Sequence, residues 1–235
     1  MRILNIIWIL INYFIYYSQH THTMQEKMDP KSLVEHIMSP VMIKNTLTQQ
    51  MFDEILHLSY FLEGFKPHNI LEVGAKGGTF GLFSRLSTGV KVAIDIEEDF
   101  RKFIHLSTTG IENVHFLCEN SQTKETFKKV KEICPQFDFI FIDGDHTYQG
   151  VENDFNLYKN LLSPRGVMVF HDIDPLHQFK GDEYAGGNAW LWWKELNEGV
   201  KSELICQHTD DRRCIVNGSP NHLGGLGFWR KTSNF

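Results

Sequence analysis

The chain has 235 residues, of which 42% are hydrophobic and 13% aromatic, which is the composition of a folded protein and the length of one α/β domain. Its 23 lysine and arginine residues against 29 aspartate and glutamate residues give a net charge of −6, which argues against a nucleic acid as the main partner because phosphate binding needs a basic surface. The four cysteines form no CxxC pair, which argues against a zinc finger, and a Cys206–Cys214 disulfide stays an alternative for a secreted chain.

The first 28 residues differ from the rest. Residues 3–17 are nearly all apolar, but this run is shorter than the roughly 20 residues that span a bilayer, and no small-x-small cleavage site follows it. Three interpretations stay open: an anchor or uncleaved signal that contacts a membrane, a helix docked on the domain or a partner, or sequence upstream of a start at Met24 or Met28. We expect residues 29–235 to form a single domain that is cytoplasmic, or membrane-associated through the N-terminal segment.

Helical spacing follows from residue 30 to about residue 65. Asp29 and Pro30 stand where a helix cap and a first helical residue belong. Apolar side chains then recur at three- and four-residue steps: Leu47, Met51, Ile55, Leu58, Phe61 and Leu62. This pattern predicts an amphipathic helix that covers one face of the core.

After Pro67, five short apolar runs alternate with helical stretches. These runs are residues 69–73, 91–94, 114–117, 137–142 and 166–170. Strand and helix in repetition predict a parallel sheet with right-handed crossovers. Two later runs, 203–207 and 226–229, lack a long helix between them and are expected to form an antiparallel hairpin at one edge. The predicted fold is Rossmann-like α/β, with a seven-stranded, mostly parallel sheet and helices on both faces.

The ends of the first two predicted strands carry residues suited to a nucleoside ligand. The first strand runs into a turn with Gly74 and Gly78, and glycines let such a turn approach a ligand closely. Glu72, just before the turn, suits a ligand with an amino group. Asp95 follows about 20 residues later, where a carboxylate accepts hydrogen bonds from ribose hydroxyls. An NAD site shares these features, but the spacing is not GxGxxG, and an ordinary tight turn is the alternative.

Two further regions suit an adenine and an acceptor. Ser121 and Gln122 follow the third strand, where amide and hydroxyl groups could meet the edge of an adenine. The alternative is that Asn120 or Ser121 caps the next helix. Beyond the fifth strand, Trp190, Trp192 and Trp193 form either a wall for an acceptor or the core side of a helix. The polar, glycine-rich residues 180–188 could act as a lid.

The fourth and fifth predicted strands end in acidic and imidazole side chains. These are Asp143, Asp145, His146, His171, Asp172 and Asp174. Because parallel strands place their carboxyl ends at one edge of a sheet, we expect these groups to share a crevice. So many oxygen ligands suit a hard cation such as Mg²⁺, although Asp145 and Asp174 could equally be solvated loop residues.

The strings ILEVGAKGG, AIDIE, FDFIFIDGDHTYQGVENDF and LLSPRGVMVFHDIDP resemble class I S-adenosylmethionine-dependent methyltransferases. The resemblance is strongest to the branch with macrolide-sugar and rhamnosyl O-methyltransferases and cephalosporin hydroxylase-type proteins. It covers roughly residues 40 to 231, and its specific parts are IDGDHTY and the HD after the fifth strand.

The resemblance implies roles by position. It places the methionine end of the cofactor beside the first strand, the ribose on Asp95, and the adenine near the third strand. The implied cofactor-binding residues are Glu72, Gly74, Gly78, Asp95, Ser121, Gln122 and Asp143. It implies a general base at His146 and Mg²⁺ ligands at Asp143 and Asp172. Ile173 departs from catechol-type enzymes, which have an amide ligand there, so Asp174, His171 or water would take that place.

The expected function is therefore S-adenosylmethionine-dependent O-methylation of a hydroxyl on a sugar or small molecule, assisted by Mg²⁺ on Asp143, Asp172 and Asp174, with His146 and Asp143 as the catalytic residues. The expected partner is a small-molecule or glycan acceptor, and a homo-oligomer stays open. Two alternatives remain: an NAD-type Rossmann oxidoreductase, and a non-catalytic cofactor-binding partner protein of the same fold.

Overall fold

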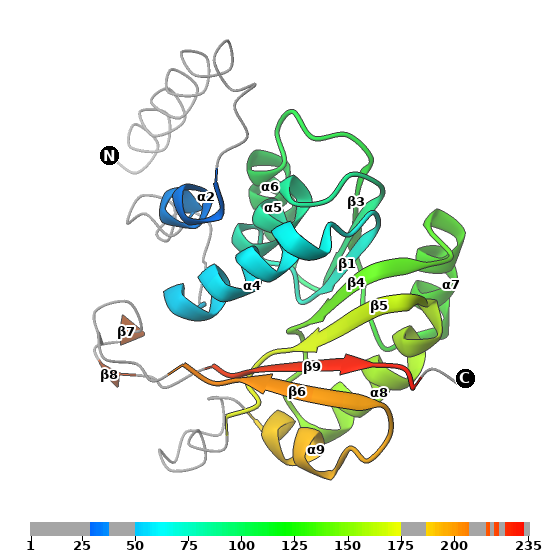
Figure 1. The fold of residues 1–235 in the computed structure, drawn as a ribbon. Coiled ribbons are helices and arrows are strands. Elements are labelled where there is room, and N and C mark those ends of the chain that lie inside the picture. The colour runs from blue at the N-terminus through cyan, green and yellow to red at the C-terminus, as the bar shows by residue number, and fades with distance from the viewer. Residues whose placement is uncertain are drawn as a thin grey trace.

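The computed structural model describes residues 29–37, 50–174, 187–206, 215–216, 219–220 and 224–232 (Figure 1). The apolar residues 3–17, Leu47, Cys214 and residues 180–186 of the predicted lid lie outside this part of the chain. Among the described residues, no helix has the length and apolar character needed to cross a membrane.

A seven-stranded sheet forms the centre of the fold. Its strands are β1 (Ile70–Val73), β2 (Lys91–Asp95), β3 (Val114–Cys118), β4 (Phe137–Ile142), β5 (Leu162–Phe170), β6 (Val200–Leu204) and β9 (Leu226–Arg230), in the order β3-β2-β1-β4-β5-β9-β6. Strands β1 to β5 pair in parallel, and β9 runs antiparallel to both β5 and β6. The predicted sheet and its antiparallel closing pair are confirmed, although β6 begins three residues before the predicted run at 203. A separate short pair joins β7 (Ile215–Val216) to β8 (Ser219–Pro220).

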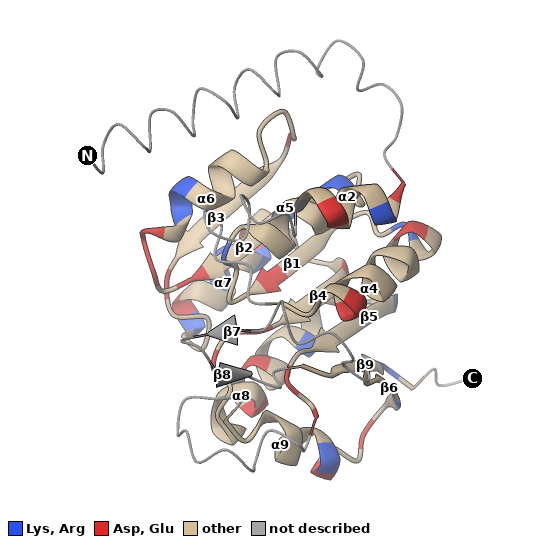
Figure 2. Cartoon of the chain, turned by 90° about the vertical axis from the view of Figure 1, so that its left-hand side faces the viewer, with Lys and Arg blue, Asp and Glu red and all other residues tan. Residues whose placement is uncertain are grey.

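Helices cover both faces of the sheet (Figure 1). One face packs against α2 (Pro30–Ile37), α4 (Phe52–Phe65), α5 (Gly78–Arg85) and α6 (Phe100–Ser107), and the other against α7 (Lys124–Ile133), α8 (Tyr148–Tyr158) and α9 (Ala189–Glu195). A 3₁₀ turn (Lys159–Leu161) links α8 to β5. Positively and negatively charged residues are mixed along α2 and around α9 (Figure 2).

The predicted helical region 30–65 contains α2 and α4, and residues 38–49 between them lie outside the described part. Asp29 caps α2 as expected, because its Oδ1 accepts hydrogen bonds from the amides of Lys31 and Ser32 at 3.0 and 3.2 Å. In α4 the buried stripe contains Ile55, Leu58 and Leu62, as the apolar spacing predicted. The same stripe contains the acidic residue Glu54, which is fully buried.

Side-chain alternation in the central strands decides which groups reach which face. Phe139 and Phe141 of β4 pack in the layer under α4 and α5, whereas Ile140 and Ile142 pack under α8. The next odd-numbered residue, Asp143, therefore follows the direction of Phe141, towards the start of α4. This alternation brings α4 into the site described below.

The tryptophan cluster is divided between core and surface. Trp192 and Trp193 are buried on α9, where the ring centroid of Trp192 lies 5.3 Å from that of Phe155 and 4.9 Å from that of Phe170. The core interpretation is thus confirmed for these two residues. Trp190 is half-buried.

Candidate active site

The turn after β1 passes between the ends of β2 and β4. The amide of Gly74 donates to the carbonyl of Ile94 at 2.9 Å, and the amide of Asp143 donates to the carbonyl of Val73 at 2.9 Å. Gly74 has φ +84°, and a Cβ on it would lie 2.1 Å from the carbonyl oxygen of Asp143. Only glycine fits this position without moving the backbone that carries Asp143. Gly78, the other predicted cofactor-binding glycine, is the first residue of α5.

Two buried carboxylates, Glu72 and Asp95, flank this turn. Glu72 is 1% exposed, and the hydroxyl of Thr79 donates to its Oε1, whereas its buried Oε2 has no hydrogen-bond partner among the described residues. Burial raises the pKa of Glu72 well above its ordinary value, and the nearby charges of Asp143 and Asp95 raise it further. A buried oxygen of this kind is the feature expected of a group that binds the amino group of a ligand.

Asp95 ends β2, beside the glycine turn. Its Oδ1 accepts a hydrogen bond from the amide of Glu97 at 2.8 Å. Burial raises the pKa of Asp95, and the positive charge of Lys76 in the glycine turn opposes that shift. The predicted ribose-binding residue thus lies next to the predicted methionine-binding turn.

Side chains of α8 form hydrogen bonds with the loop that follows β3. The hydroxyl of Ser121 donates to Oδ1 of Asp154 at 2.7 Å. The side chain of Gln122 donates to Asp145 and accepts from Asn153, each at 3.1 Å. Neither Ser121 nor Asn120 caps the next helix, because the cap of α7 is Thr123, whose hydroxyl accepts from the amide of Thr126 at 3.1 Å.

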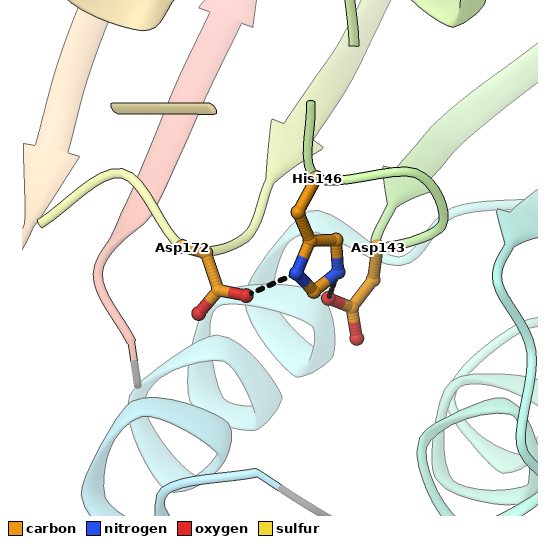
Figure 3. A group of neighbouring side chains, drawn as sticks. All are labelled: Asp143, His146 and Asp172. Carbon is orange, nitrogen blue, oxygen red and sulfur yellow. Dashed lines mark ion pairs between the residues drawn. The ribbon is translucent and has the colours of Figure 1, made fainter. Parts of the chain in front are cut away.

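An imidazole lies between the two carboxylates that follow β4 and β5 (Figure 3). Nδ1 of His146 is 2.9 Å from Oδ2 of Asp172, and its Nε2 is 3.4 Å from Oδ1 of Asp143. The ring of His146 is one-third exposed, whereas Asp172 is buried. The ring of His146 is therefore accessible from solvent, while the two carboxylates fix its orientation.

A second histidine completes the cluster from the buried side. Nδ1 of His171 lies 3.2 Å from Oδ1 of Asp143 and 3.1 Å from Oδ1 of Asp172. Its Nε2 is 3.5 Å from Oε2 of Glu54, whose other oxygen accepts from the amide of Gly225 at 2.7 Å. Gln50, just before α4, donates to Oδ2 of Asp143 at 2.6 Å. The contacts of Gln50 and Glu54 with this cluster were not predicted from the sequence.

The cluster consists of mutually stabilised charges. Burial would lower the pKa of His146, but hydrogen bonds to Asp143 and Asp172 outweigh burial and raise it to about 10. Burial would raise the pKa of Asp143, but the charges of His171 and His146 outweigh it and lower the pKa to about 2. His146 is therefore protonated at neutral pH when these side chains alone form the site.

Three side chains of the cluster have the arrangement of a cation site. One ligand atom each from Asp143, His146 and Asp172 lies within 4.8 Å of the others. Carboxylate and imidazole ligands suit a divalent metal ion, so these residues fit the expected group. Asp174, predicted as a third carboxylate ligand, is not part of this group in the described residues, and its amide donates to the carbonyl of Gly224 at 3.1 Å.

Backbone geometry fixes the two sides of the cluster. Asp172 has φ +59°, a left-handed conformation that is uncommon for a residue other than glycine and is typically found at functional sites. On the opposite side, the amide of Asn188 donates to the carbonyl of His146 at 2.9 Å, and a Cβ on Gly187 would lie 2.1 Å from that oxygen. The start of α9 thus packs directly on the backbone of His146.

Residues 71–173 match the family model for a methyltransferase domain. Two curated relatives are themselves uncharacterized: R132 of Acanthamoeba polyphaga mimivirus, 28% identical over 54% of this chain, and y4gI of Sinorhizobium fredii, 36% identical over 25% of this chain. The chain spans 64% of the length of R132 and 6% of the length of y4gI. The family match favours methyl transfer over the NAD-type alternative.

Solved structures with the same fold include methyltransferases of more than one kind. The O-methyltransferase from Bacillus cereus in complex with SAH superposes with a TM-score of 0.60 at 17% identity, over 91% of this chain and 96% of that chain. The N-methyltransferase NodS from Bradyrhizobium japonicum gives 0.51 at 14% identity, over 75% and 96%. Residues 71–173 therefore match a methyltransferase domain, and the chain has the fold of S-adenosylmethionine-dependent methyltransferases.

Proposed function

We propose that the chain is an S-adenosylmethionine-dependent O-methyltransferase that acts on a hydroxyl of a sugar or small molecule. The observation that carries the proposal is the contact of His146 with both Asp143 and Asp172, at the carboxyl ends of neighbouring strands and directly beside the Gly74 turn. Chemistry in open α/β sheets is located at this edge. A hydroxyl needs a proton acceptor before it can attack a methyl group, and an imidazole is the usual one.

The residues around the Gly74 turn fit the cofactor. The free Oε2 of Glu72 suits the amino group of the methionine portion, and Asp95 suits the ribose hydroxyls. Gly74 lets the turn pass close to the backbone of Asp143, at the same edge of the sheet. In the complex of the Bacillus cereus relative the ligand is SAH, which supports the same cofactor here.

The acidic side chains have distinct roles in the proposed reaction. Asp172 and Asp143 orient the ring of His146, so that its position towards the acceptor is fixed before the substrate binds. His146 takes the proton of the hydroxyl only when its own proton has left, which the two carboxylates oppose by raising its pKa to about 10. A divalent cation held by Asp143 and Asp172 would supply positive charge that lowers the pKa of a nearby hydroxyl. The requirement for the cation, and the choice of Mg²⁺, belong to the proposal.

Oxygen is favoured over nitrogen as the acceptor because a hydroxyl has to lose its proton when it attacks, and His146 can take that proton once its own has left. A neutral amine needs such a base less. The fold alone does not choose, since NodS shares it. A sugar or small-molecule acceptor follows from the resemblance of the IDGDHTY and HD strings to sugar O-methyltransferases. Membrane contact through residues 3–17 and homo-oligomerisation stay predictions.

Two measurements test the proposal. Isothermal titration with S-adenosylhomocysteine should show binding, and S-adenosylmethionine but not NADH should protect the chain from thermal unfolding. Transfer of a labelled methyl group should then be measured over a panel of glycans and phenols, with and without Mg²⁺. Binding without transfer to any acceptor would favour the non-catalytic partner protein, and protection by NADH would favour the oxidoreductase.

A further inference from the structure

Three neighbouring side chains of α8 hold two consecutive residues of the loop after β3. Oδ1 of Asp154 accepts from the hydroxyl of Ser121 at 2.7 Å, and the hydroxyl of Tyr158 donates to the carbonyl of Ser121 at 2.7 Å. Nδ2 of Asn153 donates to Oε1 of Gln122 at 3.1 Å. Ser121 is thus held at both its side chain and its backbone, and Gln122 at its side chain.

The carboxylate in this contact is unusual because it is enclosed in the core. Asp154 and Tyr158 are both 0% exposed, and Phe155 beside them belongs to the apolar layer under α8. The second oxygen of Asp154 has no hydrogen-bond partner among the described residues. Burying such a group costs free energy that an apolar residue in its place would avoid. A buried carboxylate at this position therefore calls for a role other than packing.

Geometry separates this contact from the catalytic cluster. In the described part of the chain, the side-chain hydrogen bonds of Asn153, Asp154 and Tyr158 join them to Ser121, Gln122 and Gln149, and none reaches Asp143, His146 or Asp172. What the contact does fix is the loop between the end of β3 and the cap of α7 at Thr123. That loop ends the strand beside β2, the strand that presents Asp95.

We propose that Asp154 is a positioning residue that, together with Asn153 and Tyr158, holds Ser121 and Gln122 in the shape that receives the base of the cofactor. This inference rests on the proposed function, since it assigns the adenine end of S-adenosylmethionine to that loop. A loop that is already held in its ligand-bound conformation loses little conformational entropy on binding, so the protein binds the cofactor more tightly. The consequence is a role in cofactor binding and none in methyl transfer itself.

The test compares variants that remove or keep the acceptor oxygen. Asp154→Ala removes it, Asp154→Asn keeps it, and Tyr158→Phe removes only the bond to the Ser121 carbonyl. Asn156→Ala, at an exposed position of the same helix, is the matched control. The dissociation constant of S-adenosylhomocysteine is measured by calorimetry, and KM for S-adenosylmethionine and kcat are measured by methyl transfer.

We expect Asp154→Ala to raise the dissociation constant and KM by about tenfold or more, the effect of one lost buried hydrogen bond, with kcat at saturating cofactor within about twofold. Asp154→Asn should restore affinity to within about threefold, and Tyr158→Phe should weaken binding by about three- to tenfold. Asn156→Ala should match the wild type. His146→Ala should do the reverse of Asp154→Ala, lowering kcat and leaving the dissociation constant nearly unchanged.

Unchanged affinity in Asp154→Ala overturns the inference, and so does an equal loss of kcat and affinity with a large fall in Tm, which would indicate a structural role only. If Asp154→Ala does not fold, the isosteric Tyr158→Phe decides, and wild-type affinity in that variant contradicts the inference. Failure of the wild type to bind S-adenosylhomocysteine would instead overturn the proposed function along with it. Normal binding without methyl transfer would leave the calorimetric test intact.

Discussion

Nδ1 of His146 lies 2.9 Å from Oδ2 of Asp172, so the ring is bound by a buried carboxylate on the side away from solvent. This contact, with that to Asp143, raises the pKa of His146 to about 10. Asp172→Asn should therefore lower the pKa of His146, because the imidazolium loses one of its two anionic partners. Titration of the His146 ring by NMR in the metal-free protein measures the change.

The matched control for this variant is Asp99→Asn, at an exposed residue of the turn before α6. It should leave the His146 titration where it is in the wild type. The raised pKa of His146 also makes the free energy of unfolding depend on pH. The stabilisation from the charged ring is complete below the ordinary histidine pKa of 6.5 and is lost as the pH rises through about 10. An unchanged titration in Asp172→Asn would show that the carboxylate does not stabilise the imidazolium.

Replacement of His146 by alanine removes the proposed base. We expect kcat to fall by roughly 10² to 10⁴, the range for loss of a general base, while the affinity for S-adenosylhomocysteine stays within about threefold. His105→Ala, at an exposed position on α6, serves as the control and should keep full activity. A loss of kcat smaller than about tenfold in His146→Ala would rule out the base.

Alanine substitutions at Gly74 and Gly110 compare backbone strain with and without a steric clash, because the two glycines have nearly the same positive φ. Gly74 has φ +84° and Gly110 has φ +79°, but a Cβ would lie 2.1 Å from the carbonyl oxygen of Asp143 at the first and meet nothing within 4 Å at the second. Gly110→Ala should cost only about 1 kcal/mol of unfolding free energy. Gly74→Ala should in addition displace Asp143 and abolish binding of S-adenosylhomocysteine.

The measurements for this pair are chemical denaturation and calorimetric binding on the same preparations. Equal stability and equal affinity in the two variants would contradict the close approach of the turn to Asp143.

The buried carboxyl of Asp154 should make the free energy of unfolding depend on pH. Burial raises the pKa of its carboxyl from 3.8 to about 7, so the folded state binds the proton more tightly than the unfolded state. The resulting stabilisation is complete below about pH 4 and is lost as the pH rises through 7. At about 1.36 kcal/mol per pH unit, the wild type should lose roughly 4 kcal/mol relative to Asp154→Asn between pH 4 and pH 8.

Urea denaturation at several pH values checks this difference. The comparison of Asn156→Ala with the wild type should show no such slope, since that position is exposed. A stability difference between Asp154→Asn and the wild type that stays constant over the range would mean that the buried carboxyl does not titrate there.

Local patterns predicted the sheet because strands and the residues that end them are close in sequence. Glu72, Asp95, Asp143 and Asp172 could be placed at one edge from the strand runs alone, and the structure brings Asp143 and Asp172 together on a single imidazole. Which of the neighbouring acids join them depends on backbone conformation that no short pattern reports. Asp172 turns towards His146 with φ +59°, whereas Asp174 is not part of the same group.

Contacts between distant segments were the part that could not be predicted. Gln50 reaches Asp143 across 93 positions, and Glu54 reaches Gly225 across 171. A signal was nevertheless present, since Glu54 stands in the apolar stripe of α4 with Ile55 and Leu58, where a charged residue is out of place unless it has a buried partner. Asp154, enclosed among apolar residues of α8, gives the same kind of signal.

The pairing of β9 between β5 and β6 has a consequence for biosynthesis. The amide of Gly225, just before β9, binds Glu54, and the carbonyls of Gly224 and Gly225 bind the residues that follow Asp172. Strand β5 ends at Phe170 and β9 begins at Leu226, so at about 5–20 residues per second the ribosome needs roughly 3–11 seconds to add the segment between them. During that interval the nascent chain carries Asp143 and Asp172 but lacks the residues that bind Glu54 and the backbone directly after Asp172. Chains that stop before Gly224 should therefore leave the ribosome with an exposed edge on β5 and a disordered catalytic cluster, and be substrates for chaperones rather than slow enzymes.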